Sequence, residues 1–194
     1  YFMEYGLRAK PRTAAAFDAP QIGTFLHYLL ENVTREVLAR GGFAQVGEED
    51  LHALVRLYIQ RYVEQELRRE LAEAVADGYT RFISGFAEGA DLMFAALVVE
   101  EKERHPELFL EAALPYAGRV KTKDKRFHEL LRLCDGVKVE SQTYAPSCYM
   151  ARNRYMVSQS QRVIAVYDGR EKGGTLFTMR YAYTLGRDVR VISI

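Results

Sequence analysis

The stretch AVYDGREKGGTLFTMRYA, residues 165–182, decides the fold class of this chain. An apolar run ends at Asp168-Gly169, and helix-like spacing of apolar residues resumes at Gly173-Gly174-Thr175. A buried strand that continues into a helix in this way is the basic unit of a parallel α/β sheet. Glycine has no Cβ atom, so such a loop turns sharply and lets an anion approach the N–H groups that begin the helix.

The stretch SGFAEGAD, residues 84–91, repeats this arrangement with a strand, Gly85, three residues, Gly89 and a helix. Neither loop is a Walker P-loop or a GxGxxG motif, so two interpretations stay open. The glycines either hold a phosphate-containing ligand between the two loops or only make tight strand-to-helix turns. Both loops are expected at the carboxyl edge of the sheet, where open α/β sheets bind ligands.

Alternating strands and helices fill the remainder of residues 79–194. The predicted strands are 79–84, 108–114, 136–140, 162–167 and 188–193, and the predicted helices are 89–104, 122–133, 148–159 and 174–186. The sequence therefore predicts an α/β fold, a Rossmann-like parallel sheet of about five strands flanked by helices.

The first 75 residues are predicted to be helical. Apolar residues share one stripe over residues 22–40, and Gly41-Gly42 ends that helix. A second helix is expected to begin after Asp50 as its N-cap and to run to Asp77-Gly78, with a break near Gln65 as an alternative. A helical segment thus precedes the sheet.

Composition excludes several function classes. The chain has 194 residues, 48% hydrophobic, with a net charge of +1, which favours one or two globular domains over a general nucleic-acid or membrane-surface binder. Cys134 and Cys148 form no CxxC motif, which favours a reducing, cytoplasmic location. No apolar run is long enough for a membrane span, and no secretion signal is predicted.

Residues from about 65 to 194 resemble the YpsA-like family of the SLOG (SMF/DprA–LOG) superfamily. The resemblance lies in DGYTRFISGFAEGADLMFA, EAALPYAGR, RNRYMV and the stretch that begins at residue 165. It implies a Rossmann-like domain that binds a nucleotide or a nucleotide derivative such as ADP-ribose or NAD, in a regulatory or sensory role and with no required cofactor. The residues expected around this small phosphate-containing ligand are Ser84, Gly85, Gly89, Asp91, Arg152, Asn153, Arg154, Asp168, Gly173, Gly174 and Thr175.

Some of these side chains also have a simpler interpretation. Arg152 and Arg154 have the fork geometry that suits phosphate, but each is alternatively a surface salt-bridge partner. Asp91 is alternatively an acid that complements the dipole in the first turn of a helix. The tyrosines of this region either stack on a base or ribose or pack between helices; they are Tyr144, Tyr149, Tyr155, Tyr181 and Tyr183.

Two departures from the family pattern matter. The family begins with a strand that runs into a Thr-Gly-His-Arg-Pro turn, and this sequence has no such segment. The sheet is therefore expected to have an edge or central gap that another segment or subunit must cover, which favours a homo-oligomer. In addition, Thr178 stands where LOG phosphoribohydrolases carry a glutamate, so we assign no catalytic residue and expect no hydrolase activity.

Residues 1–64 resemble part of the C-terminal nuclease region of AddB, a helicase/nuclease subunit of bacterial DNA repair. GTFLHYLLE, residues 23–31, is similar to the Gly-x-x-x-His-x-x-Leu-Glu opening of such nuclease modules, which makes His27 a candidate metal-site residue one helical turn from Glu31. The acidic strand, the Asp/Glu-x-Lys motif and the cluster cysteines do not follow, so no metal site is predicted. The alternative function is a fragment of a DNA-repair subunit, inactive as a nuclease alone, and only this alternative makes DNA a partner.

The two resemblances divide the chain into predicted domains 1–64 and 65–194. The junction is expected within the helix between Tyr58 and Leu71, because both patterns are helical there.

Overall fold

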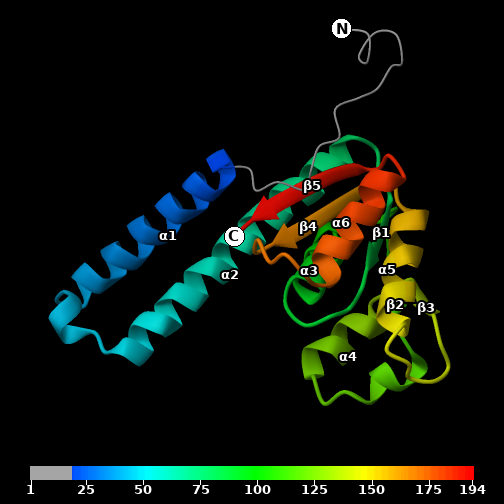
Figure 1. Cartoon of the computed structure of the whole chain (residues 1–194), viewed down its shortest axis with the longest axis horizontal. Helices are drawn as coiled ribbons and strands as arrows, with labels where there is room; N and C mark the ends of the chain where they lie inside the picture. The colour runs from blue at the N-terminus through cyan, green and yellow to red at the C-terminus, as the bar shows by residue number, and fades with distance from the viewer. Residues whose placement is uncertain (1–18) are drawn as a thin grey trace, which may run out of the picture.

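The computed structural model describes residues 19–194, so the part of the AddB-like stretch within residues 1–18 lies outside the described residues. Two long helices are followed by alternating strands and helices (Figure 1). The elements are α1 (Ala19–Ala39), η2 (Phe43–Gln45), α2 (Glu48–Ala76), β1 (Arg81–Ser84), α3 (Ala90–Glu101), β2 (Phe109–Leu114), η3 (Ala117–Lys121), α4 (Lys125–Arg132), β3 (Gly136–Val139), α5 (Cys148–Gln159), β4 (Arg162–Tyr167), α6 (Gly174–Thr184) and β5 (Asp188–Ser193).

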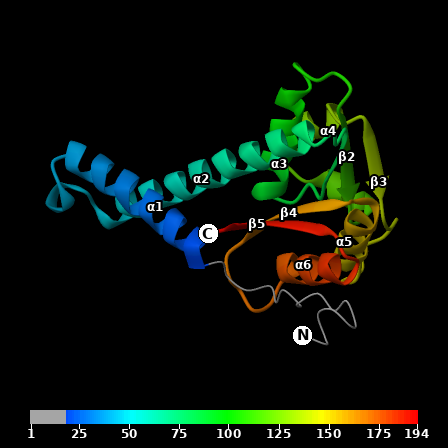
Figure 2. The same ribbon diagram turned by 90° about the horizontal axis from the view of Figure 1, so that it is seen from above.

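Helices α1 and α2 form an antiparallel hairpin that extends beyond the strands (Figures 1 and 2). Its outer part has a small core of Val33, Val37, Leu54 and Tyr58. Helix α2 is continuous over 29 residues, so the alternative of a break near Gln65 is wrong. The predicted N-cap is also wrong, because Asp50 lies in the first turn with two further acids, where its charge complements the helix dipole.

The predicted α/β class is confirmed, and the strands lie in two parallel sheets. One sheet has the order β1-β2-β3 and the other pairs β4 with β5. In the first sheet Ser84 lies opposite Ala112, and in the second Arg162 lies opposite Asp188. Strands β1 and β4 are not hydrogen-bonded to each other, so each ends its sheet on one side. This interruption agrees with the gap expected from the sequence.

Helices cover both faces of the strands. Figure 2 shows α2 and α3 on one side of β4 and β5, and α6 on the other. On the α3 side, Phe82 of β1 packs against Phe94 with ring centroids 6.1 Å apart, within the main hydrophobic core. On the α6 side, Ala165 packs with Leu176 and Met179 in a separate cluster. Two helical layers around parallel strands explain why the strands contain near-continuous apolar runs.

Glu70 of α2 is a buried acid with an incomplete set of hydrogen bonds. It is only 5% exposed, and its Oε1 accepts a 2.9 Å bond from Arg69. Its Oε2 is buried without a hydrogen-bond partner among the described residues. Burial raises the pKa of Glu70, although the Arg69 charge opposes this effect. The charged carboxylate is therefore destabilising at neutral pH.

Replacing Glu70 by glutamine is expected to raise the free energy of unfolding by about 1 kcal/mol at pH 7. The pKa of Glu70 is raised in the folded protein, whereas in the unfolded chain it is about 4.3. The wild-type protein therefore loses stability relative to Glu70→Gln as the pH rises from about 4.3 through the raised value. Urea unfolding at pH 4 and pH 7 measures the difference, which should vanish at pH 4. Glu73→Gln, at a 44% exposed partner of Arg69, is the control and should change stability by less than about 0.5 kcal/mol. A destabilised Glu70→Gln protein at pH 7 would contradict the expectation.

Candidate ligand-binding site

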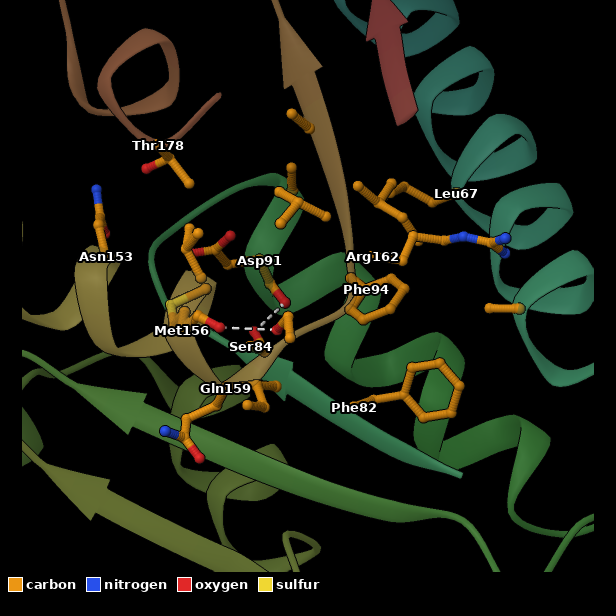
Figure 3. A pocket seen from close by; sticks show the side chains of 18 of the residues that line it. Leu67, Phe82, Ser84, Asp91, Phe94, Asn153, Met156, Gln159, Arg162 and Thr178 are labelled. Atoms are coloured by element: carbon orange, nitrogen blue, oxygen red, sulfur yellow. Dashed lines mark hydrogen bonds between the residues drawn. The ribbon is translucent and has the colours of Figure 1, made fainter. Parts of the chain in front are cut away.

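A cavity of about 810 Å³ lies between β1 and β4, within the size range of small-molecule sites. Its walls come from α2, α3, α5 and α6 as well as from the two strands (Figure 3). The predicted site residues that line it are Ser84, Asp91, Arg152, Asn153, Gly174 and Thr175. The structure thus brings parts of both glycine-containing loops to one cavity, which extends along β1 and β4 from their amino ends to the loops that follow them.

The loop from β1 to α3 is held by the side chains of Ser84 and Asp91. Ser84 Oγ donates to the Asp91 carbonyl at 2.8 Å and accepts from the Phe86 N–H at 3.3 Å. Asp91 Oδ2 accepts from the Ala87 N–H at 3.1 Å. Helix α3 begins after Gly89, whose φ of 89° favours glycine, and no side chain caps this N-terminus.

Phe86 lies in the loop that borders the cavity, and its role in holding that loop was not predicted from the sequence. Its φ is 52°, a left-handed conformation that bulky residues rarely adopt. The side chain is only 1% exposed and packs edge-to-face against Phe127 at 5.6 Å. Burial of this ring holds the strained loop in place. No local pattern around residue 86 indicates this role, because the partner lies on α4.

The loop from β4 to α6 ends in a second helix N-terminus without a side-chain cap. Gly173 is the N-cap, with a φ of 136°, and Gly174 and Thr175 of the first turn line the cavity. A Cβ atom on Gly174 would lie 3.5 Å from Asn153 Nδ2, an ordinary contact. The cavity wall also includes Thr178, whose Oγ1 donates to the Gly174 carbonyl at 2.8 Å. Two helix N-termini therefore begin beside one cavity, which is a setting that favours anions.

Arg152 of α5 contacts the loop from β1 to α3. It is 7% exposed, its Nη1 donates to the Gly85 carbonyl, and its Nε donates to Asn153 Oδ1 at 2.9 Å. Nη1 also lies 3.9 Å from Asp91 Oδ2. Burial lowers the pKa of Arg152, whereas the Asp91 charge opposes this effect. Arg152 is therefore a buried cation and not the surface salt-bridge partner of the simpler interpretation.

Gly85 permits this close approach of Arg152. A Cβ atom at residue 85 would overlap Arg152 Nη1 and lie 2.6 Å from Asp91 Oδ2. Asp91 itself keeps a 36% exposed side chain on the cavity wall. Burial raises the pKa of Asp91, and Arg152 and the Ala87 N–H act against this.

Five predicted site residues do not line the cavity. Gly85, Gly89 and Gly173 belong to the two loops that border it, and the other two are Arg154 and Asp168. Arg154 is exposed, and its guanidinium lies 5.5 Å from the ring centroid of Phe177. Asp168 is exposed and forms a 2.9 Å ion pair with Arg170. Arg154 lies within α5 and Asp168 directly follows β4, as expected from the sequence, but both side chains are exposed.

The cavity also contains residues that the sequence did not single out, among them Met156, Gln159 and Arg162 (Figure 3). Arg162 bonds Asp77 and Asp188, both at 2.7 Å, yet its Nη1 is buried with no hydrogen-bond partner among the described residues. Met156, Gln159 and Arg162 line the cavity because β1 and β4 stand apart, and the gap between these strands brings α5 and the start of β4 beside it. Sequence spacing carries no signal for this.

Three tyrosine rings form a further group at the carboxyl edge. Tyr116, which follows β2, lies 5.3 Å from Tyr144 and 6.4 Å from Tyr149 between ring centroids. Tyr149 precedes Arg152 by one turn of α5, and Tyr144 is 63% exposed. The structure therefore brings together two tyrosines singled out in the sequence with Tyr116, which was missed.

In the helical hairpin, His27 and Glu31 lie one turn apart on α1, and both are exposed. Glu31 bonds Arg35 at 2.5 Å. Within residues 19–194, no three His, Cys, Asp or Glu side chains are grouped so that they could hold a metal ion. No helix in the same range has both the length and the apolar character to span a membrane.

These features define a Rossmann-like α/β module. Its strands are parallel, and two of them continue through glycine-containing loops into helices that begin beside a shared cavity. The model of the YspA SLOG family matches residues 58–189, and the chain belongs to this family. The match begins inside α2 and includes β1 to β4 and the first two residues of β5. Membership of the SLOG family indicates a nucleotide-related module.

The chain is similar to several known proteins over part of its length. The chain is 21% identical over 127 residues to the UPF0398 protein BH1768 of Halalkalibacterium halodurans, which covers 62% of this chain and 67% of that protein. It is 30% identical over 118 residues to the uncharacterized SPbeta prophage-derived protein YoqJ of Bacillus subtilis, covering 53% of this chain and 68% of that one. A 38-residue stretch is 45% identical to an ATP-dependent helicase/deoxyribonuclease subunit of Clostridioides difficile, covering 20% of this chain and 3% of that protein. The chain thus spans only a small part of the helicase/deoxyribonuclease.

Proposed function

We propose that this chain is a binding module for a phosphate-bearing nucleotide derivative of the ADP-ribose or NAD class, with a regulatory role. The observation that carries the proposal is the convergence of α3, α6 and Arg152 on one cavity. Each helix N-terminus contributes about 0.3–1 kcal/mol toward an anion. The described contacts of Arg152 do not involve its Nη2, which is available to a phosphate oxygen. A diphosphate between the two N-termini would neutralise this cation.

The tyrosine group supports a nucleotide over a simple anion. Tyr116, Tyr144 and Tyr149 lie at the same edge as Arg152, and Tyr149 is 40% exposed. Exposed aromatic faces are suited to stack on a nucleobase. A ligand with a phosphate at Arg152 and a base on the tyrosines uses both features.

The surroundings of α6 support binding without hydrolysis. Thr178 occupies the position where LOG phosphoribohydrolases carry glutamate, and its hydroxyl is bonded to the Gly174 carbonyl. A threonine hydroxyl does not ionise at neutral pH and cannot act as a carboxylate acid or base. The proposed role is therefore recognition of the ligand rather than its cleavage.

Calorimetric titration with ADP-ribose, NAD, AMP and adenosine tests the proposal. We expect saturable binding of the phosphate-bearing ligands, with adenosine at least about tenfold weaker, because a charged hydrogen bond contributes about 1.5–3 kcal/mol. Chromatography of the same mixtures should detect no free base. Equal binding of adenosine and ADP-ribose, or no binding of any of them, would refute the phosphate site.

A further inference from the structure

Strand β2 completes a strand–helix–strand unit with β1 and α3. The two strands are parallel neighbours, with Ser84 of β1 opposite Ala112 of β2. Both strands therefore end at the same edge, and the residues after Leu114 lie next to the loop that begins at Gly85. In a unit of this kind that binds a nucleotide, a residue after the second strand contacts the ribose that carries the base. The proposed function assigns no residue to this ribose.

The segment that follows β2 is basic. Residues 115–123 contain Arg119, Lys121 and Lys123 and no acid. The next acid along the chain is Asp124, which is the N-cap of α4 and accepts a backbone N–H bond there. A carboxylate after the second strand suits the two free hydroxyl groups of a ribose, whereas an arginine suits a phosphate on the ribose. The charge of this segment therefore favours a phosphorylated ribose.

Arg119 and Tyr116 are held in one turn of the chain. The short helix η3 begins after Tyr116, and the Arg119 N–H donates to the Tyr116 carbonyl at 3.1 Å. The Tyr116 ring packs against Gly118, where an added Cβ atom would lie 3.0 Å from the ring. Tyr116 belongs to the tyrosine group on which the base is proposed to stack. This turn therefore places Arg119 beside the base end of the ligand.

The Arg119 side chain is available to a ligand. It is partly exposed, its guanidinium lies 5.0 Å from the ring centroid of Phe127, and it forms no ion pair or side-chain hydrogen bond with any residue of 19–194. Burial raises the pKa of Tyr149, and the positive charge of Arg119 opposes this effect. Burial lowers the pKa of Arg152, and the Arg119 charge acts in the same direction. Arg119 thus lies close enough to influence both the tyrosine group and the proposed phosphate site.

We propose that the nucleotide derivative carries a second phosphate on the ribose that bears its base, and that Arg119 binds this phosphate. The proposal rests on the proposed function, which places the base on the tyrosine group and the first phosphate at Arg152. The planar guanidinium has paired N–H donors that match two phosphate oxygens. The 2′- and the 3′-hydroxyl group of a ribose both accept a phosphate, and the chemistry that Arg119 recognises is common to both.

Calorimetric titration with AMP, adenosine 2′,5′-bisphosphate and adenosine 3′,5′-bisphosphate tests the proposal. We expect at least one bisphosphate to bind about tenfold or more tightly than AMP, because hydrogen bonds between two charged groups are among the strongest in proteins. The bisphosphate with the higher affinity identifies the hydroxyl group that carries the phosphate. In Arg119→Gln, both bisphosphates should bind within about twofold of AMP, because the neutral side chain no longer attracts the second phosphate.

Lys121→Gln is the matched control, because Lys121 is an exposed cation of the same short helix, two positions from Arg119. A 3₁₀-helix has about three residues per turn, so the two side chains point to different sides. Lys121→Gln should keep the bisphosphate preference of the wild type. Equal losses in the two variants would reduce the effect to general charge attraction and overturn the contact with Arg119. Circular dichroism spectra verify that both variants are folded.

The remaining outcomes separate this proposal from the proposed function. If AMP and both bisphosphates bind equally to the wild-type protein, or if ADP-ribose binds and neither bisphosphate does, only the second phosphate is refuted. A bisphosphate preference that Arg119→Gln retains would also overturn the role of Arg119. If neither AMP nor ADP-ribose binds, the phosphate site at Arg152 is refuted, and both proposals fail together.

Discussion

Replacing Gly174 by aspartate is expected to weaken ADP-ribose binding by at least about 100-fold. The new carboxylate would stand in the first turn of α6 on the cavity wall, where the proposed phosphate binds. Two like charges about 4 Å apart repel by roughly 4 kcal/mol at an effective dielectric constant of 20, and about 2.8 kcal/mol already corresponds to 100-fold. Calorimetric titration of both proteins measures the loss.

The fold should tolerate this substitution, because a Cβ atom on Gly174 meets only Asn153 Nδ2 at 3.5 Å. Gly47→Asp is the matched control, since it also adds an aspartate at a helix start, but at the N-cap of α2 and away from the cavity. Its ADP-ribose affinity should match that of the wild type. Unchanged binding by Gly174→Asp, with an intact circular dichroism spectrum, would mean that the ligand does not contact α6.

Replacing Gly85 by alanine is expected to lower the free energy of unfolding by about 3 kcal/mol, with a Tm decrease of roughly 6–12 °C. The added methyl group would overlap Arg152 Nη1 and lie 2.6 Å from Asp91 Oδ2. Arg152 would have to leave the Gly85 carbonyl, and its buried guanidinium would lose a hydrogen bond. Loss of a partner for a buried charge is among the most destabilising single changes. Calorimetric melting of the full chain measures the effect.

Gly174→Ala provides the matched glycine-to-alanine control in the same site. Its methyl group makes an ordinary contact, and alanine is favoured over glycine in a helix, so the Tm should stay within about 2 °C of the wild type or rise. If Gly85→Ala melts like Gly174→Ala, the contact between Arg152 and the β1–α3 loop does not stabilise the fold. Ligand binding by Gly85→Ala should also weaken, because Arg152 would be displaced from the cavity wall.

Local sequence patterns were sufficient to predict the order and type of the elements. The predicted strands 162–167 and 188–193 and the helix 148–159 agree with the structure at both ends. These elements depend on the periodicity of apolar side chains and on glycines at their ends, which are local properties. The predicted N-cap at Asp50 was wrong, because an acid near a helix start suits the cap and the first turn equally.

The proposed division at residue 64 and the ligand contacts of the site residues stay predictions. The location of those residues, however, depends on packing. Arg152 and Arg154 were both predicted to contact the ligand, yet α5 buries the first against Gly85 and exposes the second, whose guanidinium lies near Phe177. They are two positions apart, and the 3.6-residue period of a helix turns their side chains to different sides.

The sequence by itself determined the α/β class, the helical segment before it and the two glycine loops, because each depends on residues within about 20 positions of one another. The tertiary structure alone decided that both loops border one cavity, that Met156 and Arg162 line it, and that β1 and β4 stand apart. It also decided that the buried ring of Phe86 holds the β1–α3 loop. These features arise where elements distant in sequence meet, and the contacts between such elements follow from the packing of whole faces rather than from any local spacing.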